Sequence, residues 1–579
     1  MPSRIAGSLI PIGQIYAARS DYQQALEYYL AALPLFDTQK RENMVGWCLT
    51  NIGHVYSAYG ELTKALEYYQ QAYACYDHFT AIAAEKPIGM GAALASMANV
   101  HLSLGEKQKA IDHLKKSLEH FKIGRNTANE HLAYARMGEI YTSLGDYPQA
   151  ARYLAKARQH FHDSKSLAEA NVQSSLGNLY KSKGEYQQAL EALQPALTIQ
   201  RTLGNRRGQA QTLTNMGAVY ALQDQWQNAL RHYSEAQVLW QGISDKYSEA
   251  NTLNYLGLTY YERKEAEQAR AYFNRALTLR RTTNDREGEA NTLYNLARLD
   301  FAAQQFKSAR QQMETVLAIT ESVRATVDSE DLRASYLATV KDYYEFYVDL
   351  LMQLHQREPV AGHDGTALQA SEMARARSLS ETLADTRRQL RQGVAPELLK
   401  QEQELQQRLN AKAEYQRHLL GHKAKSELLS TAAQEIHALT AQLQETRTAI
   451  KARSPHYAAL AHSQPLNVRE IQQTLLDENT LLLAYALGKE RSYLWLVSQT
   501  SLSSYELPKS EIIEAVARRV YRLLLPQKEP GKVTTPHQSL AALSEMVLAP
   551  AAQQLGQKRL LVVADGALQY VPFGACLIR

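Results

Sequence analysis

The sequence predicts a mainly α-helical protein: a solenoid of about eight helix pairs, then a helical hairpin and an incomplete α/β domain. Three observations predict this class. Small and aromatic residues recur about every 40 residues through the first half of the chain. Two long polar segments with Leu near heptad spacing follow. Apolar runs split by short polar turns appear only after residue 480, where they indicate strands.

The repeat is visible when TNIGHVYSAYGELTKALEYYQQA (50–72) is placed beside TNMGAVYALQDQWQNALRHYSEA (214–236). Each copy has a turn position, with a small residue seven positions before it and an Ala five positions after it. The turn positions are Ser20, Gly60, Gly105, Gly145, Gly184, Asp224, Lys264 and Gln304. The small residues are Gly13, Gly53, Ala98, Gly138, Gly177, Gly217, Gly257 and Ala297. This spacing predicts a helix-turn-helix unit whose two helices approach closely at the small residue.

A Tyr one helical turn after the small residue is expected to fill the space beside it, as at Tyr56 and Tyr220. In the last copy this position is Asp300, which is consistent with a terminal repeat that caps the stack. The pattern resembles the tetratricopeptide repeat, in its longer variant, and the resemblance covers residues 4 to about 320. It implies a right-handed superhelix in which the first helix of each pair lines a concave groove.

Positions facing that groove are counted as six, three and two before the small residue, and one and four after it. They hold Asn51, Asn171, Asn215, Asn251, Asn254, Tyr261, Asn291, Asn295 and Arg298. An amide both donates and accepts hydrogen bonds, so a row of Asn suits an extended peptide backbone. We therefore expect a protein or peptide ligand in the groove. The alternative is that these amides bond to neighbouring repeats or solvate an open face.

After the repeats the helical pattern continues without the period. Residues 323–356 are expected to form a helix rich in core aromatics, and 358–366 a loop with His355 and His363 at the surface. The segments 398–419 and 426–453 predict an antiparallel hairpin. The predicted domains are the repeats (1–320), a helical capping region (321–390), the coiled-coil-like hairpin (391–455) and the C-terminal α/β segment (456–579).

The α/β segment predicts strands at 480–488, 492–499 and 501–508, and helices at 509–525 and 537–555. Residues 558–573, KRLLVVADGALQYVPF, read as a buried strand, a turn and another extended piece. The order of these segments is similar to that of bacterial TPR-CHAT proteins, whose CHAT domain belongs to the caspase-like cysteine peptidases. The family's DGxLxxxPF strand-turn is matched by Asp565, Gly566, Leu568, Pro572 and Phe573. We read these five residues as structural.

The resemblance implies nucleophilic catalysis by a Cys–His dyad on strands that follow the DGxLxxxPF piece. Residues 574–579 hold no His, so no catalytic residue is assigned and we expect a truncated domain without peptidase activity. Cys576 is an unfavourable candidate nucleophile because neither His462 nor His537 has dyad spacing to it. Three functions remain: a peptide-binding scaffold attached to a cut-short peptidase domain, a pure protein-interaction scaffold, or a peptide-sensing regulator.

Composition narrows these choices. The net charge of +5 is small for 579 residues and predicts no strong attraction to nucleic acid or membranes. No apolar run is long enough to span a membrane. Three cysteines form neither a disulfide framework nor a zinc pattern, so no metal and no cofactor are expected. A cytoplasmic location is expected, although the N-terminus enters a repeat directly and a leader could precede it.

Overall fold

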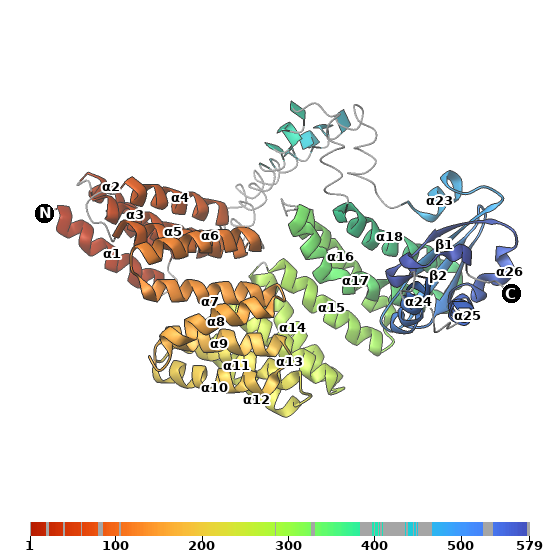
Figure 1. Cartoon of the computed structure of the whole chain (residues 1–579), viewed down its shortest axis with the longest axis horizontal. Helices are drawn as coiled ribbons and strands as arrows, with labels where there is room; N and C mark the ends of the chain where they lie inside the picture. Colours follow the sequence, from red (N-terminus) through yellow and green to blue (C-terminus); the bar gives the residue numbers. More distant parts are fainter. Residues whose placement is uncertain are drawn as a thin grey trace, which may run out of the picture. The chain divides into compact units, whose positions relative to one another are not determined.

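The computed structural model (Figure 1) describes residues 2–18, 22–38, 41–58, 61–78, 85–103, 106–283, 285–325, 330–382, 466–524 and 536–575, with scattered positions between 397 and 449. Its contacts divide the chain into two compact units. The repeat unit is Met1–Thr283, and the sheet unit is Asn284–Arg579.

The repeat unit is a stack of helix pairs, in which each odd-numbered helix packs against the even-numbered helix that follows it. The helices are α1 (Pro2–Ala18), α2 (Tyr22–Asp37), α3 (Glu42–Ala58), α4 (Leu62–His78), α5 (Glu85–Ser103), α6 (Lys107–Ile123), α7 (Thr127–Ser143), α8 (Tyr147–Phe161), α9 (Leu167–Ser182), α10 (Tyr186–Thr202), α11 (Arg206–Ala221), α12 (Trp226–Gly242), α13 (Lys246–Glu262) and α14 (Ala266–Thr282). The predicted solenoid of helix pairs is confirmed.

Local sequence explains where these helices begin and end. Where the structure describes the turn position, it has a left-handed backbone, with φ of 76° at Gly145, 78° at Gly184, 56° at Asp224 and 65° at Lys264. Gly accepts this conformation without strain and Asp tolerates it. Odd-numbered helices begin after a side chain that accepts a backbone N–H of the first turn: Asn126 for α7, Ser166 for α9, Asn205 for α11 and Asp245 for α13.

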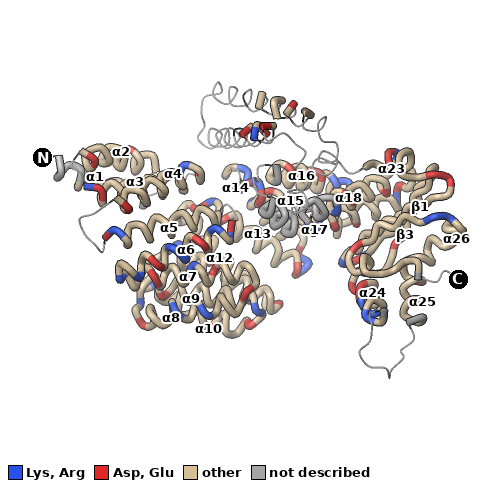
Figure 2. The backbone as a smooth tube through the Cα atoms, turned by 45° about the horizontal axis from the view of Figure 1, so that its top comes forward, with Lys and Arg blue, Asp and Glu red and all other residues tan. Residues whose placement is uncertain are grey.

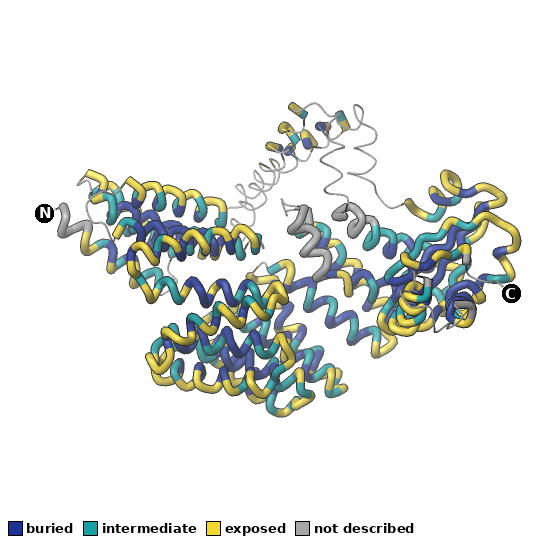
Figure 3. The backbone as a smooth tube through the Cα atoms, in the orientation of Figure 1, coloured by how far each residue is buried: buried dark blue, intermediate teal, exposed yellow. Residues whose placement is uncertain are grey.

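The small residue lets the two helices of a pair approach closely, as the repeat pattern predicts. A Cβ added to Gly53 would lie 2.5 Å from the Tyr69 ring, and one added to Gly217 would lie 2.6 Å from the Tyr233 ring. The side chain over the glycine therefore comes from the second helix. The expectation that Tyr56 fills this space is wrong, because its ring stacks instead on Tyr68 at 5.2 Å. Figure 3 shows the resulting buried layer between paired helices.

The sheet unit contains the last helix pair and the C-terminal sheet. Its elements are α15 (Arg286–Ala302), α16 (Phe306–Ala325), α17 (Glu330–Arg357), η1 (Pro359–Ala361), α18 (His363–Thr382), α23 (Val468–Thr474), β1 (Thr480–Ala486), β2 (Ser492–Val497), β3 (Leu502–Leu507), α24 (Ser510–Leu524), α25 (Pro536–Val547), η3 (Ala549–Ala551), α26 (Ala552–Leu555), β4 (Arg559–Val563), η4 (Gly566–Tyr570) and η5 (Phe573–Ala575). The strands predicted near the C-terminus are present, and they form a small mixed sheet.

The sheet has the strand order β3-β2-β1-β4. The first three strands form an antiparallel meander, whereas β4 runs parallel to β1, with Leu483 opposite both Leu496 and Val562. One face packs on α24 and α25 through a core that includes Leu483 and Ile513. The other face meets α17, where the Tyr493 hydroxyl donates to Asp349 at 2.6 Å. The sheet is therefore covered by helices on both faces, as strands in α/β domains usually are.

Three sequence expectations are corrected in this unit. The piece after the Asp565 turn is a 3₁₀ helix (η4) and not extended. Strand β4 is not buried, because it lies at the edge of the described sheet and Leu561 is 39% exposed. His363 lies inside rather than at the surface, since α18 begins there and packs on α17, where His363 contacts Arg310 and Glu358.

Most of the predicted hairpin, 391–455, lies outside the described residues. Among the positions that are described, Leu405, Leu439 and Leu443 form a small buried cluster. The hairpin and the four predicted domain boundaries stay predictions.

Figure 2 shows acidic and basic residues interspersed along the helices of the repeat unit.

Candidate peptide-binding face

The first helices of successive repeats form a continuous layer. Helix α7 contacts α9, α9 contacts α11 and α11 contacts α13 directly, whereas the even-numbered helices lack contacts of that extent. In a curved stack the more closely spaced layer lies on the inside, so the odd-numbered helices line the concave side. We call the groove-facing positions of α7, α9, α11 and α13, counted from Gly138, Gly177, Gly217 and Gly257, the odd-helix face.

The outermost row of this face, six residues before each glycine, carries amides in three consecutive repeats. Asn171 and Gln211 are exposed, and Asn251 is half-buried. Gln211 donates to Asn215 at 3.4 Å, and Asn251 accepts from Arg280 at 3.0 Å. Gln211 was not among the predicted site residues, although the same count from Gly217 reaches it.

The row nearer the glycines holds the repeats together. Ser175 donates to the Glu139 carboxylate of the preceding repeat at 2.7 Å, and the hydroxyls of Thr214 and Thr252 lie 3.5 Å apart. The predicted site residue Asn215 is 8% exposed, and Asn254 is 4% exposed. These two amides therefore offer little surface to a ligand, as the alternative interpretation anticipates.

The remaining predicted positions are dispersed. Asn51, on α3, donates to its own helix at Trp47 O at 2.8 Å. Tyr261 is half-buried at the end of α13, with the Lys264 ammonium 5.7 Å from its ring centroid. In the sheet unit, Asn291 donates to the Tyr343 hydroxyl at 3.5 Å, Asn295 is 4% exposed and Arg298 lies over the Tyr294 ring at 5.8 Å.

Lys181 and Asn178 were missed by sequence reasoning, although the count from Gly177 reaches both. Lys181 occupies the last turn of α9 and is half-buried. Burial lowers the pKa of its ammonium below the usual value. Among the residues that the structure describes, none forms an ion pair or hydrogen bond with it. One turn earlier, the Asn178 Oδ1 atom is buried and accepts no hydrogen bond from the described part of the chain.

The DGxLxxxPF residues tie the ends of β1 and β4 together. Asp565 accepts from Leu487 N at 2.7 Å and from Gly566 N at 2.9 Å. Gly566 has a φ of 51° and lies against Glu514, so a side chain there would clash. Leu568 is fully buried in the sheet core, and the Phe573 ring lies 5.7 Å from that of Tyr485. Pro572 is exposed.

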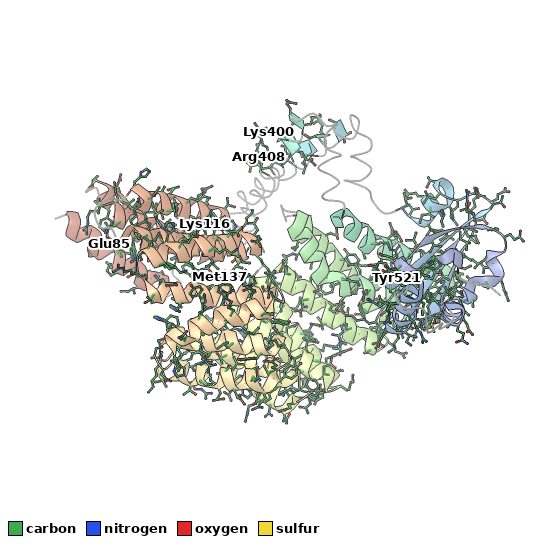
Figure 4. All side chains as sticks on the ribbon, viewed as in Figure 1. Glu85, Lys116, Met137, Lys400, Arg408 and Tyr521 are labelled. Atoms are coloured by element: carbon green, nitrogen blue, oxygen red, sulfur yellow. The ribbon has the colours of Figure 1, made fainter. Side chains whose placement is uncertain are left out.

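No catalytic constellation is visible in the described ranges. Cys576 lies outside them, and burial raises the pKa of the fully buried Cys48 thiol to about 12, which leaves it unreactive. No group of His, Cys, Asp and Glu in the described residues could hold a metal ion. None of the described helices is long and apolar enough to cross a membrane. Figure 4 marks Met137, fully buried in α7, and the partly exposed Tyr521 of α24.

A stack of helix pairs of this kind defines a repeat scaffold of the protein-binding class. The tetratricopeptide repeat family model matches residues 4–78, 129–202, 208–282 and 249–322. These residues form an array of tetratricopeptide repeats, as the sequence resemblance predicts. No curated protein sequence matches the chain.

Solved structures with similar folds include a signal-transduction ATPase with a tetratricopeptide repeat sensor from Pyrococcus horikoshii, at 16% identity over 64% of this chain and 54% of that chain, with a TM-score of 0.43. Aspartyl phosphate phosphatase F from Bacillus subtilis is 13% identical over 64% of this chain and 94% of its own, with a TM-score of 0.39. A tetratricopeptide repeat protein from Parabacteroides merdae is 18% identical over 48% and 93%, with a TM-score of 0.33. TM-scores this low carry no conclusion about partners or activity.

Proposed function

We propose that the repeat unit binds an extended segment of a partner protein along the odd-helix face. The observation that carries this proposal is the row of Asn171, Gln211 and Asn251, which presents an amide at the same position in three consecutive repeats. An amide side chain can pair with both the N–H and the C=O of an extended backbone, and one such amide is present in each of the three repeats. The row nearer the glycines already forms hydrogen bonds between repeats. The side chains that recognise the ligand are therefore expected in the outermost row and in the last turns of the odd-numbered helices.

Binding is tested with the full chain on a panel of immobilised peptides of about 12 residues, each of random sequence. Substitution of Asn171 or Gln211 by Arg places a bulky charge on the odd-helix face and is expected to reduce binding about tenfold or more, by obstructing the backbone contact. The matched control is Gln187→Arg, on the exposed side of α10, which should bind like the wild type. Equal loss in all three variants, or no bound peptide with the wild type, contradicts the proposal.

The sheet unit supports a second part of the proposal: residues 456–579 belong to a CHAT-type caspase-like domain, and the repeats regulate it. Support comes from the parallel β1–β4 pair covered by helices on both faces and from the way Asp565 and Gly566 link the two strand ends. The resemblance implies that the dyad belongs to strands later in such a domain, so the present chain is proposed to act in binding and regulation.

A peptidase assay tests this part. The full chain is incubated with a fluorogenic peptide mixture and compared with its Cys576→Ala variant. We expect no difference between the two, because no His stands at dyad spacing to Cys576. Cleavage that disappears in Cys576→Ala would show a nucleophile in this chain and overturn the assignment. A separate protease, added to both samples as a control, should cleave equally in each.

A further inference from the structure

The outer side of α24, in the sheet unit, is acidic at its start and basic at its end. The acidic Glu511 lies in the first turn, and the second half of the helix carries Arg518, Arg519 and Arg522. Arg518 pairs with Glu514 at 3.0 Å. Glu511, Arg519 and Arg522 are exposed and form no ion pair within the part of the chain that the structure describes. Both ends of the helix therefore present charge that the described fold does not neutralise.

Four outward positions of this helix form one line, which we call the α24 stripe. It consists of Glu511, Ala515, Arg518 and Arg522. The steps of four, three and four residues correspond to about three helical turns, so the four side chains lie on the same side of the helix. Ala515 is exposed and carries only a methyl group, which leaves room for the long side chain of a second helix.

Large apolar and aromatic side chains flank the stripe. Ile512 is 48% exposed and Tyr521, labelled in Figure 4, is 41% exposed. The Tyr521 ring lies 5.4 Å from the ring of Tyr570 of η4, which is 61% exposed. Tyr and Arg are the residue types that dominate protein–protein interfaces. The order of charges along α24 also suits the helix dipole, but the dipole does not require these exposed apolar and aromatic side chains.

We infer that a second copy of this chain docks antiparallel along α24. A two-fold axis through the middle of the stripe places Glu511 opposite Arg522 of the partner subunit at two equivalent contacts, and Ala515 opposite Arg518 of the partner subunit. Glu514 neutralises Arg518 within each copy, so the two central guanidinium groups do not meet as unpaired charges. The stripe is thus its own complement, as a symmetric dimer requires, whereas a partner of uniform charge would match only half of it.

The test is the mass of the full chain in solution, measured by sedimentation velocity at increasing protein concentration. The wild type is expected to approach twice the mass of one chain. Glu511→Arg and Arg522→Glu each place like charges opposite each other at both contacts, and each is expected to weaken dimerisation about tenfold or more. The matched control is Glu545→Arg on the exposed side of α25, which should dimerise like the wild type.

A mixture of the two variants distinguishes this contact from any other. In an equal mixture, Glu511→Arg and Arg522→Glu bring opposite charges together at both contacts, so the mixture should dimerise although neither variant does so alone. The double variant Glu511→Arg/Arg522→Glu should regain dimerisation for the same reason.

Three results overturn the inference: a wild type that stays monomeric at every concentration, single variants that dimerise as the wild type does, or a mixture that stays monomeric. Restored dimerisation in the mixture also shows that both variants are folded. Because α24 lies in the sheet unit, the outcome does not depend on whether the repeat unit binds a peptide.

Discussion

At the residue scale, one pair of positions links the two helices of most repeats; the exception is the α9–α10 repeat, where the two positions hold Tyr180 and Ala192. The rings stack in Tyr56–Tyr68 at 5.2 Å, and other repeats stack Tyr16–Tyr28, Tyr141–Tyr153 and Tyr260–Tyr272 in the same way. The equivalent pair is His101–His113 in one repeat and Tyr220–His232 in another. In the last repeat it becomes a hydrogen bond, with Gln312 donating to Asp300 at 2.9 Å. The pair position is kept while its chemistry changes.

His232 makes this pair sensitive to pH. It is buried, and its Nδ1 donates to Asn228 O at 2.8 Å. Burial lowers the pKa of His232 below its usual value, so the unfolded chain binds a proton more readily than the folded one. The stability that this His contributes is complete above the unfolded pKa, about 6.5. It is lost as pH falls through the lower folded value.

We therefore expect the free energy of unfolding to fall between pH 7 and pH 5, and the fall to be smaller in His232→Tyr. In this variant the new Tyr ring can stack on Tyr220, as Tyr153 stacks on Tyr141 and Tyr272 on Tyr260 in other repeats. A Tyr side chain does not titrate in this pH range. Urea unfolding followed by circular dichroism at both pH values measures the difference. An identical pH dependence in the two proteins contradicts the assignment to His232.

At the element scale, α17 joins the last helix pair to the sheet within the sheet unit. On one side, the Tyr343 ring lies 4.7 Å from Tyr294 of α15. On the other, Asp349 accepts two hydrogen bonds from Arg491, both at 2.8 Å, and one from the Tyr493 hydroxyl at 2.6 Å. The Arg491 guanidinium and Asp349 hold each other in the bidentate geometry that makes such pairs strong.

Substitution of Asp349 by Asn is expected to destabilise the sheet unit by about 2 kcal/mol, because it removes the anion and leaves Arg491 partly buried without a counter-charge. Fluorescence of the fully buried Trp495 on β2 follows the loss of the sheet in urea. The matched control is Asp342→Asn on the same helix, whose ion pair with Lys489 at 2.8 Å is exposed and is expected to contribute less than about 1 kcal/mol. Equal effects of the two changes would show that α17 does not hold the sheet through Asp349.

At the scale of the whole molecule, the repeats were predictable because each is determined locally. The Gly or Ala of one helix, the left-handed turn position and the Ala of the next helix recur in the sequence, and φ of 78° at Gly184 or 65° at Lys264 follows from the same register. The strands were predictable because apolar runs of strand length are rare elsewhere in the chain. Both signals reflect short-range constraints on the backbone.

What the sequence did not reveal depends on contacts between distant residues. The burial of His363, the edge position of β4 and the 3₁₀ helix at 566–570 follow from which elements pack together. The lone cation of Lys181 is of the same kind, because a lysine in a helical pattern reads as solvated until its surroundings are known. In the groove prediction, counting could not separate the exposed Asn171 from the buried Asn254.

The two-sided packing of α17 determines where this protein can be divided. A fragment beginning at residue 456 would retain every strand of the described sheet, yet it would uncover the face of Tyr493 and deprive Arg491 of Asp349, its counter-charge. The helix that closes the array is at the same time a layer of the domain that follows it. Exchange of the C-terminal region between related proteins, in the laboratory or in evolution, would therefore preserve a folded product only when the junction precedes Glu330.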